Sequence, residues 1–156
     1  MMKILAKPLL RPFFVLLGLI TRPMILGVRA VVENQQGEIL LVRHTYVEGW
    51  HLPGGGVERG ETLAQAITKE VLQEAAIELS APPRQFHTYK NPRTSRFDHL
   101  TLFVCDDWRE AGPWKPNLEI AEIGFFDRNA LPEGTSKATL RRLAELDGTQ
   151  PINDIW

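Results

Sequence analysis

Residues 51–79, HLPGGGVERGETLAQAITKEVLQEAAIEL, constrain the fold of this chain more than any other stretch. A run of glycines leads into a sequence with the spacing of an amphipathic helix. Thr62 and Gln65 match a capping box, in which each side chain accepts the backbone N–H of the other residue. The spacing therefore predicts an extended segment, a glycine loop and a helix over 62–77.

Two glutamates lie where this helix is expected to be apolar. At 3.6 residues per turn, one stripe of the helix holds Leu63, Ile67, Glu70, Glu74 and Ile77. Like charges one turn apart repel, and partial burial adds to the cost. Three arrangements are expected for the carboxylates: pairing with Lys or Arg, solvation on an outer flank of the helix, or binding of a divalent cation. Carboxylate oxygens without nitrogen or sulfur ligands favour Mg²⁺ or Mn²⁺.

The preceding glycine loop favours the cation. Glycines let a backbone approach a ligand closely, and they leave its N–H and C=O groups accessible. A metal ion beside the loop would gain a backbone carbonyl and close access to a phosphate. The stretch does not fit an ATP-type P-loop, because the position that needs lysine holds Glu61, which would repel phosphate.

The other segments predict one α/β domain, a mixed β-sheet with helices packed on it. A chain of 156 residues suits a single core. Strands are expected at 28–33, 38–44, 85–90, 96–105 and 119–127. The first two should form a hairpin across the turn at 34–37, and the next two should pair across 91–94. A last helix is expected over 136–146.

Composition constrains the expected partners and the cellular compartment of the protein rather than its activity. The formal net charge is −1, so no global nucleic-acid footprint is present and no nucleic-acid partner is expected. The one cysteine, Cys105, lies in an apolar run and is expected to be a buried thiol rather than a nucleophile. A chain without an internal disulfide fits a reducing compartment, so we expect a cytoplasmic location.

Residues 1–26 differ from the domain expected over 27–156. Lys3, Lys7, Arg11 and Arg22 interrupt a largely apolar stretch, and its longest uncharged run, 12–21, is too short to cross about 30 Å of hydrocarbon. A signal peptide is disfavoured, because no small-x-small cleavage site follows. Two interpretations stay open. The segment packs on the chain's own domain or on a twin subunit in a homodimer, or it forms an interfacial or partner-binding helix, with a weak contact with a membrane surface.

The glycine loop and helix together resemble the Nudix box, G-x5-E-x7-R-E-U-x-E-E-x-G-U, where U is aliphatic. The 23 residues of the box match the pattern at Gly55, Glu61, Glu70, Glu74 and Ile77. The resemblance implies the family fold, an α/β/α sandwich with a mixed β-sheet. It implies hydrolysis of a nucleoside diphosphate linked to another group, such as ADP-ribose, or of a nucleoside triphosphate.

Three residues depart from the box. Lys69 replaces an arginine, keeping its charge but losing the planar fork that could bind Glu61. Ala76 replaces a glycine, which costs on the order of 1 kcal/mol if this position is left-handed. Gln73 replaces a glutamate that helps to hold metal in the family, and its amide oxygen can coordinate but brings no charge.

The resemblance also implies roles within the site. Mg²⁺, with Mn²⁺ as a substitute, would be held by Glu70, Glu74 and the Gly54 carbonyl, with Gln73 as a weaker ligand. Glu61 belongs to the implied catalytic motif. A carboxylate must take the proton of the attacking water, and the candidates are Glu70 and, from another segment, Glu119 and Glu122.

Substrate contacts are less constrained by the sequence. The candidates for contacting the substrate are Arg43, His51, Gly55 and Gly56. Alternatively, Arg43 is a solvated surface residue and His51 makes an ordinary structural hydrogen bond. A second function stays open because of Gln73: a degenerate Nudix domain that binds a nucleotide or a protein partner without hydrolysing anything.

Overall fold

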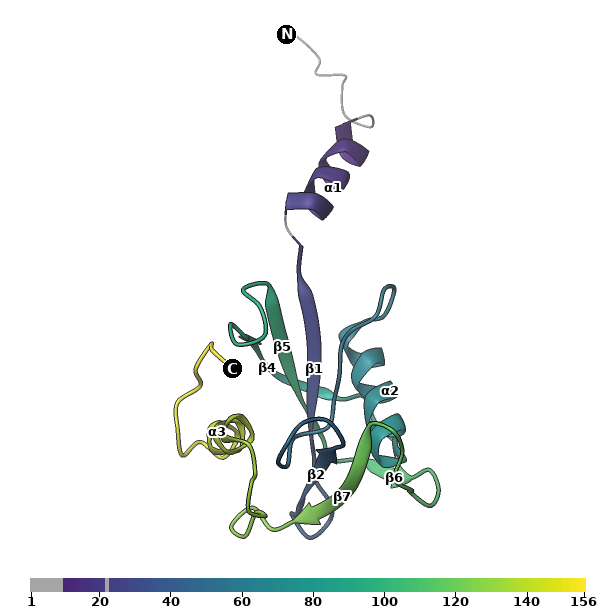
Figure 1. Ribbon diagram of the computed structural model, residues 1–156, viewed down its shortest axis with the longest axis vertical. Coiled ribbons are helices and arrows are strands. Elements are labelled where there is room, and N and C mark those ends of the chain that lie inside the picture. Colours follow the sequence, from purple (N-terminus) through teal and green to yellow (C-terminus); the bar gives the residue numbers. More distant parts are fainter. Residues whose placement is uncertain (1–9, 22) are drawn as a thin grey trace.

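The computed structural model describes residues 10–21 and 23–156, with the side chains of the first helix described from Val15 onward. The elements in chain order are α1 (Leu10–Thr21), β1 (Ile25–Val32), β2 (Ile39–His44), α2 (Leu63–Ala75), β3 (Ile77–Leu79), β4 (Arg84–Lys90), β5 (Asp98–Cys105), β6 (Trp108–Glu110), β7 (Ile120–Phe126) and α3 (Lys137–Leu146). Figure 1 shows the strands between α2 on one side and α3 on the other.

Strand β1 organises the domain. On one edge it pairs in parallel with β5, which pairs antiparallel with β4. On the other edge it bonds to the glycine loop, with Val28 N–H donating to Gly55 O and Ala30 N–H to Pro53 O, both at 2.9 Å. Two further pairs complete the sheet structure, β2 with β7 and β3 with β6. The glycine loop is therefore held as an additional extended neighbour of β1.

The residues of β1 alternate between two cores, as expected for a strand buried on both faces. Val28 and Ala30 pack in the core that contains Ile67 of α2. Val31 packs in the core that contains Leu143 of α3. Helices thus cover both sides of the strands, which confirms the predicted α/β sandwich with mixed strand directions.

Helix α2 begins as the capping box predicts and ends earlier than expected. The Thr62 N–H donates to Gln65 Oε1 (2.9 Å), and the Gln65 N–H donates to Thr62 Oγ1 (3.1 Å). The helix ends at Ala75, because Ala76 is left-handed, with φ 53° and ψ 39°. Ile77 therefore lies in β3 rather than in the helix.

One predicted pairing is wrong and another is confirmed. β1 and β2 share only a bridge between Glu33 and Ile39, because β1 pairs with β5 and β2 with β7. Both strands are apolar enough to be buried on both faces. Such strands lie in the interior of the fold, where they pair with strands from distant segments of the sequence. The hairpin of β4 and β5 has the expected pairing. β3 and β6, with three residues each, were not predicted.

Helix α1 projects from the N-terminal end of β1, away from the rest of the domain in Figure 1. Its described apolar side chains, from Val15 to Ile20, are exposed. The expectation for the segment 1–26 rests partly on residues 1–9 and 22, which lie outside the described residues. In the part of the chain that the structure describes, no helix is both long and apolar enough to cross a membrane.

Candidate active site

The glycine loop is wedged between β1 and α2, and two of its residues have no room for a side chain. A Cβ on Gly54 would lie 2.1 Å from the carbonyl oxygen of Val28, and Gly54 has φ +142°. A Cβ on Gly55 would lie 2.5 Å from Glu70 Oε1. Glycine at these positions lets the loop touch β1 on one side and the carboxylate of Glu70 on the other.

Glu74 is fixed against this loop. It is 5% exposed, and its Oε2 accepts the backbone N–H of Gly54 at 2.8 Å. Burial raises the pKa of the Glu74 carboxyl to about 7, although the Gly54 N–H and the charge of Arg29 oppose the shift. A cation would therefore favour the ionised form of Glu74, which burial disfavours.

Glu70 is half-buried one turn earlier. Its carboxylate makes no hydrogen bond or salt bridge to any described residue. Burial raises the pKa of Glu70, against the charges of Lys69 and Arg29. The adjacent Lys69 is directed elsewhere, toward Glu61. Within residues 15–21 and 23–156, neither Glu70 nor Glu74 forms a salt bridge with a basic side chain, so the pairing with Lys or Arg that was one alternative is not what the structure shows.

The donor set fits one small divalent cation. It offers the Glu70 carboxylate, the second oxygen of Glu74 and the Gly54 carbonyl, which accepts no hydrogen bond among the described residues; Mg²⁺ favours such oxygens. The described side chains contain no group of three or more His, Cys, Asp or Glu residues placed to hold a metal ion. Gln73, which is exposed and uncharged, stands where the Nudix box has a glutamate.

Glu61 belongs to an ion cluster beside this pair. Lys69 Nζ lies 2.7 Å from Glu61 Oε1 and 3.1 Å from Glu58 Oε1. The hydrogen bond from Lys69 lowers the pKa of Glu61 and raises the pKa of Lys69. Glu61 also accepts the Glu58 N–H at 2.9 Å. Lys69 thus retains the contact with Glu61 without the arginine fork, and the contacts of Glu61 suit a role in holding the loop.

Arg29 is a site residue that the sequence did not indicate. It lies on β1, and its Nη1 donates to the Val28 carbonyl at 2.9 Å. Burial lowers the pKa of the Arg29 guanidinium, while the charges of Glu74 and Glu70 oppose the shift. The available signal was a single charge inside the apolar run GVRAVV, a pattern that marks an arginine with a specific partner.

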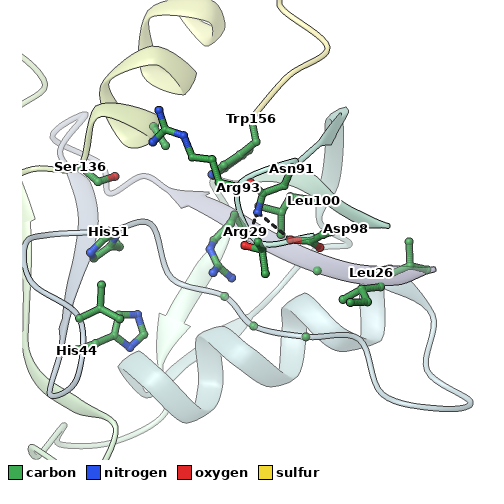
Figure 2. A pocket seen from close by; sticks show the side chains of 18 of the residues that line it. Leu26, Arg29, His44, His51, Asn91, Arg93, Asp98, Leu100, Ser136 and Trp156 are labelled. Carbon is green, nitrogen blue, oxygen red and sulfur yellow. Dashed lines mark hydrogen bonds between the residues drawn. The ribbon is translucent and has the colours of Figure 1, made fainter. Parts of the chain in front are cut away.

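A cavity of about 640 Å³ opens beside the glycine loop, within the range of about 300–1,000 Å³ usual for ligand sites. Figure 2 shows Arg29, Arg93, Asp98 and Trp156 gathered around it. Its lining includes three cationic residues, Arg29, Arg93 and Lys137, and one acidic residue, Asp98, so cationic residues predominate. A cationic cavity next to carboxylates that suit a metal ion favours an anionic ligand such as a diphosphate.

Of the predicted substrate contacts, His51, Gly55 and Gly56 line this cavity, whereas Arg43 does not. Arg43 lies opposite Glu122 in the register of β2 and β7, and its Nε donates to Glu122 Oε2 at 3.1 Å. The pairing explains why Arg43 is directed away from the cavity. The same ion pair engages Glu122, one of the two candidate remote bases.

Glu119 differs from Glu122 in its surroundings. It is exposed, precedes β7 and lines a smaller hollow together with Gln73 and Glu74. Its charge contributes to the raised pKa values of Glu70 and Glu74. Among the described residues its carboxylate has no ion-pair partner. The geometry therefore favours Glu119 over Glu122 as the remote acid near the site.

Known structures share this fold. A Nudix hydrolase from Nitrosomonas europaea superposes with a TM-score of 0.64 at 21% identity, over 81% of this chain and 90% of that chain. The MutT Nudix hydrolase from Burkholderia pseudomallei gives a TM-score of 0.62 at 21% identity, over 78% of this chain and 97% of that chain.

Sequence relatives carry nucleotide hydrolase names. The 8-oxo-dGDP phosphatase of Homo sapiens is 28% identical over 125 residues, covering 76% of this chain and 37% of the relative. The RNA pyrophosphohydrolase of Yersinia enterocolitica is 35% identical over 85 residues, covering 51% of this chain and 47% of the relative. The chain thus spans half or less of these relatives. A model of the NUDIX domain matches residues 23–146, and the chain therefore belongs to the Nudix family.

Proposed function

We propose that this chain is a divalent-metal-dependent pyrophosphohydrolase that cleaves a nucleoside diphosphate linked to another group. The observation that carries the proposal is the pair Glu70 and Glu74, set against the glycine loop without a basic partner among the described residues. The nucleotide phosphatase and pyrophosphohydrolase names of the relatives support the substrate class.

The residues of the chain divide into two roles. Glu70, Glu74 and the Gly54 carbonyl would hold Mg²⁺ or Mn²⁺, which supplies Lewis-acid stabilisation of the negative charge on the diphosphate. Arg29 lines the cavity and interacts with the charges of Glu74 and Glu70, so its part-buried guanidinium can bind a phosphate oxygen. Arg93 and Lys137 extend the cationic lining toward the rest of the substrate.

Hydrolysis requires an acceptor for one proton. The oxygen of a water molecule bonds to phosphorus, the bridging P–O bond breaks, and the proton of the water passes to a carboxylate. Glu119 suits this role because it is exposed and lines the same hollow as Glu74. Glu70 is the second candidate, because its carboxylate adjoins Gly55 of the glycine loop and has no basic partner among the described residues.

A substrate panel tests the proposal. Purified full-length protein is incubated with Mg²⁺ and with ADP-ribose, nucleoside triphosphates, 8-oxo-dGDP and triphosphorylated RNA, and release of phosphate is followed after phosphatase treatment where needed. Turnover should fall about 10²-fold or more in Glu74→Gln, because this change removes a charged ligand. Glu78→Gln is the matched control, since Glu78 forms only an exposed ion pair with Arg109.

A non-hydrolysing nucleotide-binding domain is the second candidate function. The exposed, uncharged Gln73 and the lack of a third metal-binding acid among the described side chains favour it. Saturable nucleotide binding with no turnover in Mg²⁺ or Mn²⁺ would support this candidate over the enzyme. Turnover gained in Gln73→Glu from an inactive wild type would identify Gln73 as the cause.

A further inference from the structure

The helix α1 presents apolar side chains to solvent. Its exposed fractions run from 43% to 71% for Val15, Leu16, Leu17, Leu19 and Ile20. The apolar surface continues at the start of β1 with Met24, Ile25 and Leu26, which are 41% to 54% exposed. So long a run of large exposed apolar side chains is unusual on a free surface and indicates a binding site.

The distribution of these side chains around the helix indicates which kind of partner could cover this apolar surface. Successive residues of an α-helix are rotated by about 100°, so Val15, Leu19, Leu16, Ile20 and Leu17 are spread over an arc of about 200°. A single partner helix covers one stripe of such a helix and leaves the remainder in water. A lipid phase covers every side chain on a broad arc at once.

The charge of the segment points to anionic lipid. Five basic residues precede the first acidic residue, Glu33, and four of them, Lys3, Lys7, Arg11 and Arg22, belong to the segment before β1. Basic residues beside an apolar helix are attracted to anionic headgroups while the apolar side chains enter the acyl boundary. Twelve helical residues span about 18 Å, against about 30 Å of hydrocarbon, so the helix would lie within the interface.

We propose that α1 docks this protein on the surface of an anionic lipid bilayer. The proposal is independent of the hydrolytic function. It has one consequence for the site: Ile25 and Leu26 follow α1 closely in the chain and line the cavity, so a docked α1 would hold this part of the lining near the membrane.

Vesicle flotation tests the proposal. Full-length protein is mixed with vesicles of phosphatidylcholine alone or of phosphatidylcholine with phosphatidylglycerol. We expect flotation with the mixed vesicles, weaker flotation at high salt and little with phosphatidylcholine alone. Replacing Leu16, Leu19 and Ile20 together by Asp should reduce the floating fraction about tenfold. Leu140→Asp, at an exposed apolar residue of α3, is the control and should float like wild type.

Three results would overturn the proposal. These are no flotation of the wild type, equal flotation of the triple α1 variant, or equal flotation with neutral vesicles. A dimer of the wild type that dissociates in the triple variant, together with absent flotation, would assign the surface to a second copy of the chain. Circular dichroism and thermal unfolding of both variants show whether each remains folded.

Discussion

The carboxylate of Glu70 fills the space where a side chain of Gly55 would lie: a Cβ there would be 2.5 Å from Oε1 and 2.8 Å from Oε2. The glycine of the loop and the acid of the helix therefore depend on each other. The neighbouring Gly54 has a different constraint, because a Cβ there would meet the backbone of Val28 and Arg29.

Alanine at the two glycines should have different effects. Gly55→Ala should fold, since the end of the flexible Glu70 side chain can move, but the apparent affinity for Mg²⁺ should fall about tenfold or more. Gly54→Ala should lower the free energy of unfolding by about 2 kcal/mol or more, because backbone atoms cannot move aside and the φ of +142° strains alanine. Urea denaturation and Mg²⁺ titration of activity measure both effects. Wild-type Mg²⁺ dependence in Gly55→Ala would contradict the first.

Ala76→Gly should stabilise the protein. Ala76 is left-handed at the end of α2, with φ 53°, a conformation that costs alanine about 1 kcal/mol relative to glycine. A domain of this size should gain roughly 2–4 °C in Tm. The preceding Ala75 is helical and buried, so Ala75→Gly should lower Tm instead. An unchanged or lower Tm in Ala76→Gly would show that the strain is relieved in another way.

The metal-free protein should lose stability as the pH rises from about 4.5 to 7. The folded state raises the pKa of Glu74 from 4.5 to about 7, so the unfolded chain releases this proton first. Glu74 adds most to the free energy of unfolding below pH 4.5, and this contribution is lost as the pH passes the folded pKa. The free energy of unfolding should change by roughly 3 kcal/mol at most. Urea unfolding with a chelator at several pH values should show this slope, and Glu74→Gln should flatten it. Identical pH profiles for both proteins would contradict the raised pKa.

Arg29→Gln should reduce kcat/KM by about 10²-fold, because it removes a part-buried cation that lines the cavity and interacts with the charges of Glu74 and Glu70. Loss of that charge should also raise the pKa of Glu74 further, which would move the acid limb of the pH–rate profile upward. Arg109→Gln, which breaks only the exposed pair with Glu78, is the control. A wild-type kcat/KM in Arg29→Gln would remove Arg29 from the site.

What could be predicted from the sequence depended on local interactions. The capping box of Thr62 and Gln65 involves neighbours in the chain, and the spacing of Glu70 and Glu74 follows from helix geometry alone. The pairing of β1 with β5 could not be predicted, since it joins residues about seventy positions apart whose apolar patterns would suit several partners. Arg29 was missed for the same reason, because its partners come from α2 and other distant segments. The pairing of Arg43 with Glu122 is likewise set by register between distant strands.

Direct measurement of metal binding is the most decisive experiment, because the central claim is that Glu70 and Glu74 together hold a divalent cation. Electron paramagnetic resonance of Mn²⁺ titrated into the substrate-free protein reports bound ion without relying on activity. We predict saturable binding by wild type, displaced by Mg²⁺, retained in Glu78→Gln and lost when Glu70 and Glu74 are both changed to Gln. Equal Mn²⁺ binding by wild type and the double variant, or no saturable binding by wild type, would contradict the account.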